Sequence, residues 1–537
     1  MDSFHEEAAR NVAHVSRRSD KPSGAVPLGL QCQRNSLVSI HRSLPEDILR
    51  EVFVQCLPIT HNSTFSPRDA PVLLTHVCRR WRNVALSTPS LWCSLHVPLR
   101  LSQDFHSAMG VWLGHAGALP LSLSFGSPAD RFSSNLPDLS PYFKTLQTMP
   151  NPLHTVTLEL RGEEDNIKAF LEEHRKSGFS PTQTVKKLGV RVDALNPYSI
   201  QHSVLSLLKL QENRALRGLE LSAAFHILAL PEGFELPTPW ANLQTLDLQS
   251  HNFYDGFPMA IRLGVLLSIL SRCPNLVQLK AFAAGVLHAR STMDLPDVVL
   301  HPRLRHASLF IMNLASIDNV EFLGKCDWPI LTSLHLGYKG QIGSDPERGY
   351  ILNKIIEKWG NRLTLLRFTY PSINREHLRY FLSQLPHLVQ LHIEDGTVQK
   401  LQVGIVSDDS DSDDEDEDPP EDDVIASLTP DEELSEHFCP LLQYFRWDGR
   451  TRFSDKAVIN LLSTRALSPA SPVRMKQVVI NFHRGAQEDV EAACSELIAG
   501  GLRLHLKYRV PRKSDPKFSG PYRGLTVEQD PLALGWM

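Results

Sequence analysis

The sequence lacks any pair of cysteines in a C-x-x-C arrangement, although it contains 8 cysteines in 537 residues. These cysteines are scattered along the chain from Cys32 to Cys494. Zinc modules and disulfide frameworks both depend on cysteines at short, regular spacings. We therefore expect neither, and this cysteine usage fits a reducing compartment.

Long hydrophobic runs and an excess of basic charge are also missing. No uninterrupted apolar run approaches the roughly 18 residues that a membrane-spanning helix needs. The first residues, M-D-S-F-H-E-E, have neither the basic start nor the apolar core of a secretory signal. The formal net charge is -5, whereas nucleic-acid-binding proteins usually carry a basic face. We expect a cytoplasmic or nuclear protein, or one found in both compartments, that binds neither membranes nor nucleic acid.

The common catalytic and nucleotide-binding motifs are absent as well. The sequence has no G-x-x-x-x-G-K-[ST], no G-x-G-x-x-G after a predicted strand, no G-x-S-x-G and no H-E-x-x-H. The 23 histidines are dispersed, and His335 and His392 are expected to be outward-facing surface residues rather than ligands. We expect no catalytic residue, no cofactor and no metal site; an enzyme with a cryptic active site is the least favoured class.

Residues 43–97 contain two short amphipathic patterns. In the first, Ser43 and Glu46 have the spacing of a capping box, with Pro45 in the first turn. The pattern predicts a second helix from Pro71 up to Thr88, after a loop over residues 58–70. One face of this second helix would carry the apolar residues Leu74, Val77, Cys78, Trp81 and Ala85. Two helices of this length cannot bury both apolar stripes alone, so the rest of the chain or a partner must cover them.

This stretch resembles the F-box, in the form abundant in mushroom-forming fungi, and we assign residues 40–97 to such a domain. The match consists of Leu44-Pro45, Ile48-Leu49, Val52-Phe53, Val77-Cys78-Arg79-Arg80-Trp81-Arg82, Ala85, Ser87-Thr88-Pro89 and Leu91-Trp92. The resemblance implies docking onto a Skp-family adaptor and, through it, onto a cullin–RING ubiquitin ligase. The adaptor-binding residues it implies are Leu44, Pro45, Ile48, Leu49, Val52, Phe53, Trp81, Leu91 and Trp92. Of these, Leu44, Pro45, Ile48 and Leu49 would face the adaptor. Trp81, Leu91 and Trp92 would brace the domain.

Beyond about residue 91 the sequence repeats an apolar helical stretch, a break and an L-x-x-L-x-L strand. Clear copies begin at Leu243, Leu276, Leu331, Leu363 and Leu388, and strand cores are roughly 25 to 35 residues apart, as in leucine-rich repeats. We expect an α/β fold in which residues 98–506 form an irregular leucine-rich-repeat-like solenoid of strand-helix repeats after the small helical F-box. The repeats resemble those of F-box proteins, but the Asn that usually ladders one repeat to the next is missing. The alternative is a set of unrelated βα units in a doubly wound sheet.

Three segments are expected to be disordered: a leader over residues 1–39, an acidic loop over 404–433 and a basic tail over 507–537. The acidic loop contains S-D-D-S-D-S-D-D-E-D-E-D-P-P-E-D-D, a run that repels itself. Ser410 and Ser412 each have an acidic residue three positions later, which is typical of the sites of acidophilic kinases. Phosphorylation of both serines is therefore a hypothesis.

The outward positions of the repeat strands are the candidate surface for a target protein. Aligning the strands places on one face Glu220, Asp247, Lys280, His335, Arg367, His392 and Arg446. These residues either select a target or only keep the sheet solvated, and the sequence leaves both open. We expect a substrate-recognition subunit of an SCF-type (Skp adaptor–cullin–F-box) E3 ubiquitin ligase. The alternative is an adaptor-bound scaffold or repeat-type interaction module that does not direct degradation.

Overall fold

The structure is a computed structural model, and it describes a defined part of the chain. The described residues are 44–98, 105–126, 145–146, 148–149, 151–162, 185–194, 213–223, 239–249, 253–254, 257–258, 261–284, 297–312, 317–339, 348–370, 375–395, 422–426, 428–429, 438–451, 453–467, 473–482 and 484–508. The chain divides into two compact units, residues 1–96 with 107–121, and residues 97–106 with 122–537.

The first unit is helical. It contains α4 (Glu46–Gln55), α5 (Val72–Val77), α6 (Arg79–Leu86), the 3-10 turn η1 (Pro89–Trp92) and most of α7 (Phe105–His115). Helix α4 begins after Pro45, which makes no side-chain capping bond; Ser43, the other half of the expected capping box, lies outside the described residues. The expected single second helix is wrong, because the chain is extended at Cys78 and separates α5 from α6. The Cys78 sulfur accepts from the backbone N–H of Trp81 and so caps α6.

Aromatic rings hold the first unit together. Phe53 of α4 is fully buried, and its ring lies 4.8 Å from that of Trp81. Trp112 of α7 packs edge-on against Trp92 at 4.8 Å and against Phe65 at 4.9 Å. The helical unit therefore extends beyond the expected boundary at residue 97.

The second unit is built on a 15-stranded sheet that does not close on itself. Its strands, in the order in which they neighbour one another, are β1 (Ser94–Pro98), β2 (Leu121–Gly126), β3 (Leu153–Gly162), β4 (Lys187–Ala194), β5 (Gly218–Ala223), β6 (Thr245–Gln249), β10 (Gln278–Ala284), β12 (His306–Met312), β14 (Ser333–Lys339), β15 (Leu365–Tyr370), β16 (Gln390–Asp395), β17 (Tyr444–Thr451), β18 (Gln477–Phe482) and β19 (Arg503–Lys507), with β9 (Ile261–Arg262) paired to β10. Every neighbouring pair from β3 to β19 is parallel. The strand order follows the chain without reversal, whereas a doubly wound sheet reverses it. The fold class is therefore α/β with a large, open parallel sheet.

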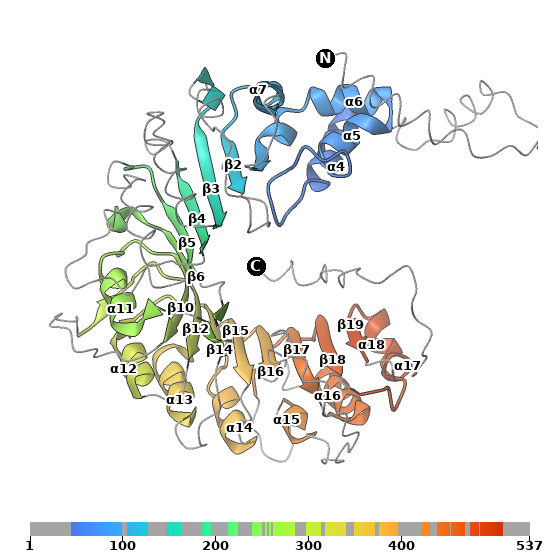
Figure 1. Cartoon of the computed structure of the whole chain (residues 1–537). Coiled ribbons are helices and arrows are strands. Elements are labelled where there is room, and N and C mark those ends of the chain that lie inside the picture. The colour runs from blue at the N-terminus through green and yellow to red at the C-terminus, as the bar shows by residue number, and fades with distance from the viewer. Residues whose placement is uncertain are drawn as a thin grey trace, which may run out of the picture. The chain divides into compact units, whose positions relative to one another are not determined.

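Two separate two-stranded sheets pair β7 (Phe253–Tyr254) with β8 (Phe257–Pro258), and β11 (Val299–Leu300) with β13 (Cys326–Asp327). The helices of the unit are η5 (Trp240–Asn242), α11 (Leu263–Ser271), α12 (Ile317–Lys325), α13 (Arg348–Trp359), α14 (Arg375–Ser383), α15 (Asp422–Ala426), α16 (Asp455–Leu467), α17 (Val490–Ala493) and α18 (Ser495–Ala499). Figure 1 shows α11 to α16 on the same side of the strands.

The alternating leucines of the strands form the core beneath these helices. One register row consists of buried residues on nine successive strands: Leu221, Leu248, Ala281, Leu309, Leu336, Phe368, Ile393, Trp447 and Ile480. Side chains alternate between the two faces of a strand, so the residues between these positions point to the face opposite the helices.

Two expected disorder boundaries are wrong. Within the expected acidic loop, residues 422–426 form α15, whose Ile425 is 1% exposed, as is the nearby Leu428. These two apolar side chains stabilise the segment, and the carboxylate of Asp422 accepts hydrogen bonds from the backbone N–H and hydroxyl of Ser454. At the other boundary, Lys507 ends strand β19 rather than beginning a tail.

Candidate functional site

The outward positions expected to meet a target occupy one register row of the sheet. Each residue pairs in register with the next, and Ser308 completes the series: Glu220, Asp247, Lys280, Ser308, His335, Arg367, His392 and Arg446. The structure thus brings the seven candidate residues into one line, while their role in binding stays a prediction.

At the β5–β10 end of the row, Glu220 and Asp247 form ion pairs with Arg191 and Lys280. Arg191 bridges Glu159 at 2.9 Å and Glu220 at 2.8 Å. Burial would lower the pKa of Arg191, but the hydrogen bond and charge of Glu220 raise it. Further along, Lys280 lies 3.9 Å from Asp247. Pairs that are partly open to solvent in this way contribute little to stability.

In the middle of the row, His335 is held by its neighbours. Its Nδ1 lies 2.9 Å from the hydroxyl of Ser308, and the ring of Phe310 meets it edge-on at 4.7 Å. Burial, with the charge of Arg367 second, lowers the pKa of His335 to about 2, so the imidazole is neutral at physiological pH. His335 thus lies on the expected outward face of the sheet, but it is half-buried there.

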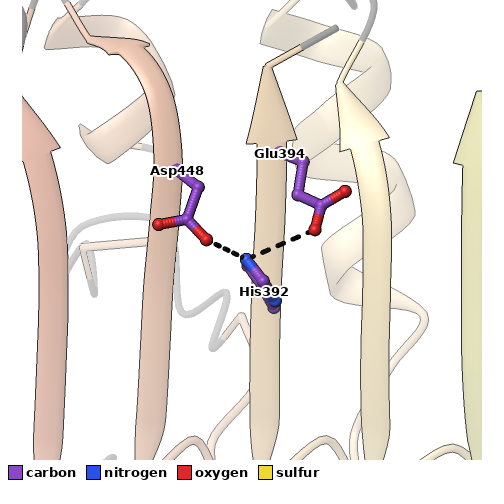
Figure 2. A group of neighbouring side chains, drawn as sticks. All are labelled: His392, Glu394 and Asp448. Atoms are coloured by element: carbon purple, nitrogen blue, oxygen red, sulfur yellow. Dashed lines mark hydrogen bonds and ion pairs between the residues drawn. The ribbon is translucent and has the colours of Figure 1, made fainter. Parts of the chain in front are cut away.

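The β15–β17 end of the row contains a cluster of polar side chains joined by hydrogen bonds and ion pairs. His392 Nε2 lies 2.7 Å from Asp448 Oδ2 and 3.7 Å from Glu394 Oε1 (Figure 2). Arg446 Nε donates to the same Asp448 oxygen at 2.6 Å, and Arg367 Nε donates to Glu394 Oε1 at 2.6 Å. His392 is only 5% exposed, so this expected surface histidine is buried, whereas His335 is half-buried.

The electrostatics of this cluster follow from burial and from its hydrogen bonds. Burial alone would raise the pKa of Asp448, but hydrogen bonds from His392 and Arg446 outweigh it and lower that pKa to about 2. Burial lowers the pKa of His392, although its hydrogen bond to Asp448 acts in the opposite direction. At neutral pH the imidazole of His392 is therefore neutral and the carboxylate of Asp448 is charged.

Sequence reasoning missed Glu394 and Asp448 as members of this cluster. His392 and Glu394 alternate on β16, and the register pairs Glu394 with Asp448 of β17. The available signal was the H-x-E pattern on a strand followed by R-W-D on the next strand. The acidic insertion obscured it, since 56 residues separate His392 from Asp448.

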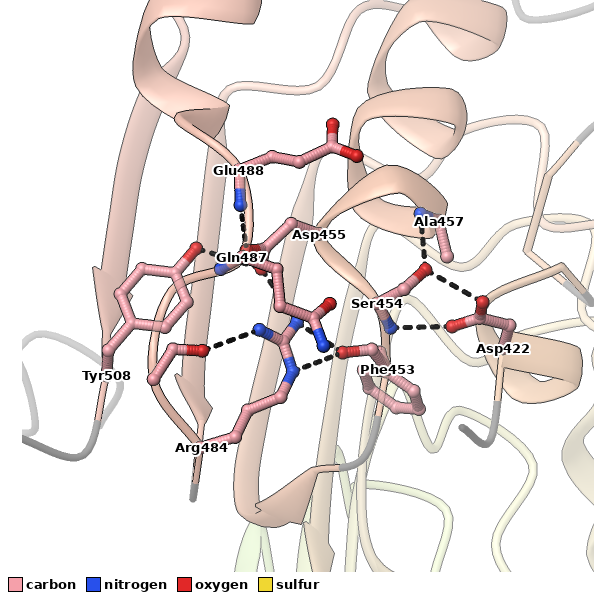
Figure 3. Close-up of polar contacts among 10 residues, drawn as sticks. Asp422, Phe453, Ser454, Asp455, Ala457, Arg484, Gln487, Glu488 and Tyr508 are labelled. Atoms are coloured by element: carbon pink, nitrogen blue, oxygen red, sulfur yellow. Dashed lines mark hydrogen bonds and ion pairs between the residues drawn. The ribbon is translucent and has the colours of Figure 1, made fainter. Parts of the chain in front are cut away.

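A second buried network lies where α16 begins. The carboxylate of Asp455 accepts from Arg484 Nη2 at 2.7 Å and from the backbone N–H groups of Gln487 at 2.6 Å and Glu488 at 2.9 Å. The hydroxyl of Tyr508 donates to the same carboxylate at 3.1 Å (Figure 3). These contacts join the start of α16 to the segments that follow β18 and β19, so the network is structural.

The nine residues expected to bind an adaptor divide into buried and accessible groups. The buried group, which forms the core of the first unit, consists of Leu49, Phe53, Leu91 and Trp92. Direct partner contact by these four is not supported, because each is at most 5% exposed. Leu44 and Trp81 are half-buried, whereas Pro45, Ile48 and Val52 are exposed.

Two helices of the first unit present aliphatic side chains to solvent. On α4, Ile48 is 50% and Val52 is 43% exposed, and on α5, Leu73 is 43% and Val77 is 50% exposed. Each pair has i, i+4 spacing and therefore lies on one face of its helix. Leu73 was missed because it falls outside the stripe that the sequence pattern selected.

Comparison with known proteins adds no further assignment: no family model and no curated protein matches this sequence. In the described part of the chain, no helix has the length and apolar character needed to cross a membrane. Ser410 and Ser412, the candidate phosphorylation sites, lie outside the described residues.

Proposed function

We propose that this chain is the substrate-recognition subunit of an SCF-type ubiquitin ligase. The helical first unit is an F-box that docks on a Skp-family adaptor, and the second unit is an irregular leucine-rich-repeat-like solenoid whose polar sheet face binds a target protein. The chain itself performs no chemistry in this proposal. It raises the effective concentration of the target near the ubiquitin-loaded enzyme.

The observation that supports adaptor docking is the pair of aliphatic strips on α4 and α5. The unit already buries Leu49 and Phe53, yet it leaves Ile48 and Val52 of the same helix in water. Grouped exposed apolar side chains are typical of protein interaction sites. They also agree with the F-box resemblance, which assigns Ile48 and Val52 to the adaptor interface.

The target-binding part of the proposal depends on the outward register row of the sheet. Parallel strands place equivalent positions side by side, so a row of charged and polar side chains extends across β5 to β17. Such a row suits recognition of another polypeptide by its charge pattern. Glu159, Glu220 and Asp247 make the β5 side of the row acidic, whereas Glu394 and Asp448 balance the two arginines at the other end, so the charge changes along the row.

The experiment is capture of a purified Skp-family adaptor by the purified full chain, followed by proximity labelling in cells. If the chain is a substrate receptor, at least one labelled protein accumulates when the gene that encodes this chain is deleted. If the chain is a scaffold, the adaptor is captured but no labelled protein changes in abundance. Failure to capture the adaptor contradicts both versions.

A further inference from the structure

The His392 cluster brings three potential metal ligands together on the polar face of the sheet. The donor atoms are one imidazole nitrogen and one carboxylate oxygen each from Glu394 and Asp448, and all lie within 4.8 Å of one another. Within the described part of the chain, no other three histidine, cysteine or acidic side chains bring their donor atoms this close together. We propose that these three residues bind a divalent transition-metal ion, with Zn²⁺ the preferred ion.

Two of the three separations between donor atoms are close to those that such a site requires, and the third, between Glu394 and Asp448, is at most 4.8 Å. Zinc is bound by histidine and carboxylate at about 2.0–2.2 Å, so neighbouring ligands of a tetrahedral ion lie about 3.4 Å apart. His392 Nε2 is 2.7 Å from Asp448 Oδ2 and 3.7 Å from Glu394 Oε1. Small side-chain rotations lengthen the distance from His392 to Asp448 and shorten the distance from His392 to Glu394. Figure 2 shows the three side chains converging from two adjacent strands.

The surrounding residues fit the part of an outer shell. Arg367 and Arg446 hold the carboxylates of Glu394 and Asp448 from the side, and Asn481 donates to Asp448 Oδ1 at 2.6 Å. Carboxylate ligands in metal sites are commonly oriented by hydrogen bonds of this kind. Glu394 Oε1 contacts both Nε and Nη2 of Arg367, so an ion must displace one of these contacts. Asp448 Oδ2 can keep its bond from Arg446 Nε and exchange its contact with His392 for the ion, because a carboxylate oxygen has two lone-pair positions.

The ligand set also favours one class of ion. An imidazole nitrogen with carboxylate oxygens suits Zn²⁺ and its transition-metal neighbours, whereas Mg²⁺ and Ca²⁺ prefer oxygen ligands alone. The two arginines already balance the two carboxylates, so the ion brings net positive charge. We therefore expect binding in the micromolar range, and a fourth position open to water or to an anionic group.

The test is equilibrium dialysis of the purified full chain against Zn²⁺ at concentrations from about 1 to about 100 µM, with bound metal measured by mass spectrometry. Because the chain has 23 histidines, the informative quantity is the difference between variants. His392→Ala and the nearly isosteric Glu394→Gln should each bind about one equivalent less, or bind it at least ~tenfold more weakly. The matched control is His387→Ala, which removes an exposed imidazole just before the same strand.

The same titration is followed by the thermal unfolding midpoint. Zn²⁺ should raise the midpoint of the wild type and of His387→Ala, because an ion that binds only the folded state stabilises it. It should not raise the midpoint of Glu394→Gln, whose fold can be checked by circular dichroism. Equal stoichiometry and affinity in the wild type and both cluster variants would overturn the proposal. This inference does not depend on adaptor binding, and neither result of the zinc test bears on that function.

Discussion

The indole N–H of Trp112 donates to the backbone oxygen of Trp92 at 3.0 Å, and the two rings meet edge-on. Trp112 is 3% exposed, so Trp112→Ala leaves a cavity and an unpaired carbonyl. We expect the free energy of unfolding of the helical unit to fall by about 3–5 kcal/mol. Urea denaturation followed by circular dichroism measures this free energy.

The neighbouring Val111 is 57% exposed, so Val111→Ala should change stability by less than about 0.5 kcal/mol. Equal losses in the two variants would contradict the packing of α7 in this unit.

The buried carboxylate of Asp455 predicts a pH-dependent stability. Burial acts to raise its pKa, but the hydrogen bond from Arg484 and those from two backbone N–H groups outweigh it and lower the pKa below the usual value. The unfolded-state pKa is about 3.9. The stabilisation is therefore fully present above that pH and is lost as the pH falls through the lower, folded-state pKa.

Asp455→Asn should lower the free energy of unfolding at pH 7 by about 3–5 kcal/mol, because Arg484 loses its buried partner. The difference between this variant and the wild type should shrink in urea titrations taken from pH 5 towards pH 2. Glu491→Gln, at an exposed position of α17, serves as the control with little change at either pH. A difference that does not depend on pH would mean that Asp455 does not act through its charge.

Helix α15 predicts a folded contribution from a segment next to the acidic run. Ile425 is 1% exposed, so Ile425→Ala should cost about 2–5 kcal/mol. Ala426 is exposed, so Ala426→Ser should be close to neutral. Hydrogen exchange of residues 453–467 provides a local readout, because Asp422 binds Ser454 at the start of α16. Unchanged stability and exchange in Ile425→Ala would show that α15 does not pack on the sheet's helical layer.

Gly337 lies beneath an aromatic ring on the polar face. A Cβ at this position would overlap the ring of Phe310, so Gly337→Ala should destabilise the fold by about 1–3 kcal/mol. Shortening the opposing side chain should relieve part of this cost. A double-mutant cycle with Phe310→Ala measures the coupling, and a coupling energy near zero would contradict the predicted overlap.

Much of the sheet could be predicted from the sequence, because alternating leucines determine which face of each strand is buried. The repeat beginning at Leu388 and the strand containing Phe445 are adjacent in the sheet despite the long insertion, with Leu391 paired to Phe445. The outward register row followed from the same alternation. Neither inference required knowledge of contacts distant in the sequence.

The parts that could not be predicted depend on tertiary contacts. The break at Cys78 is invisible to a periodicity argument, since the apolar stripe continues through it. Trp112 joins the helical unit through Trp92, although the sequence between them reads as the start of the repeats. The cluster around His392 combines two strands separated by the acidic insertion, and burial of this histidine results from neighbours that a single strand does not reveal.

Adaptor affinity decides whether the helical unit acts as an F-box. Isothermal titration of a purified Skp-family adaptor into the full chain should give one-to-one binding with a Kd below about 1 µM, and Ile48→Ala with Val52→Ala should weaken it at least ~tenfold, or ~1.4 kcal/mol. Because both side chains are exposed, the double variant should retain its fold. Ile59→Ala, at a loop position that is 77% exposed, should bind like the wild type. No binding by the wild type, or equal affinity in the double variant, would contradict the account.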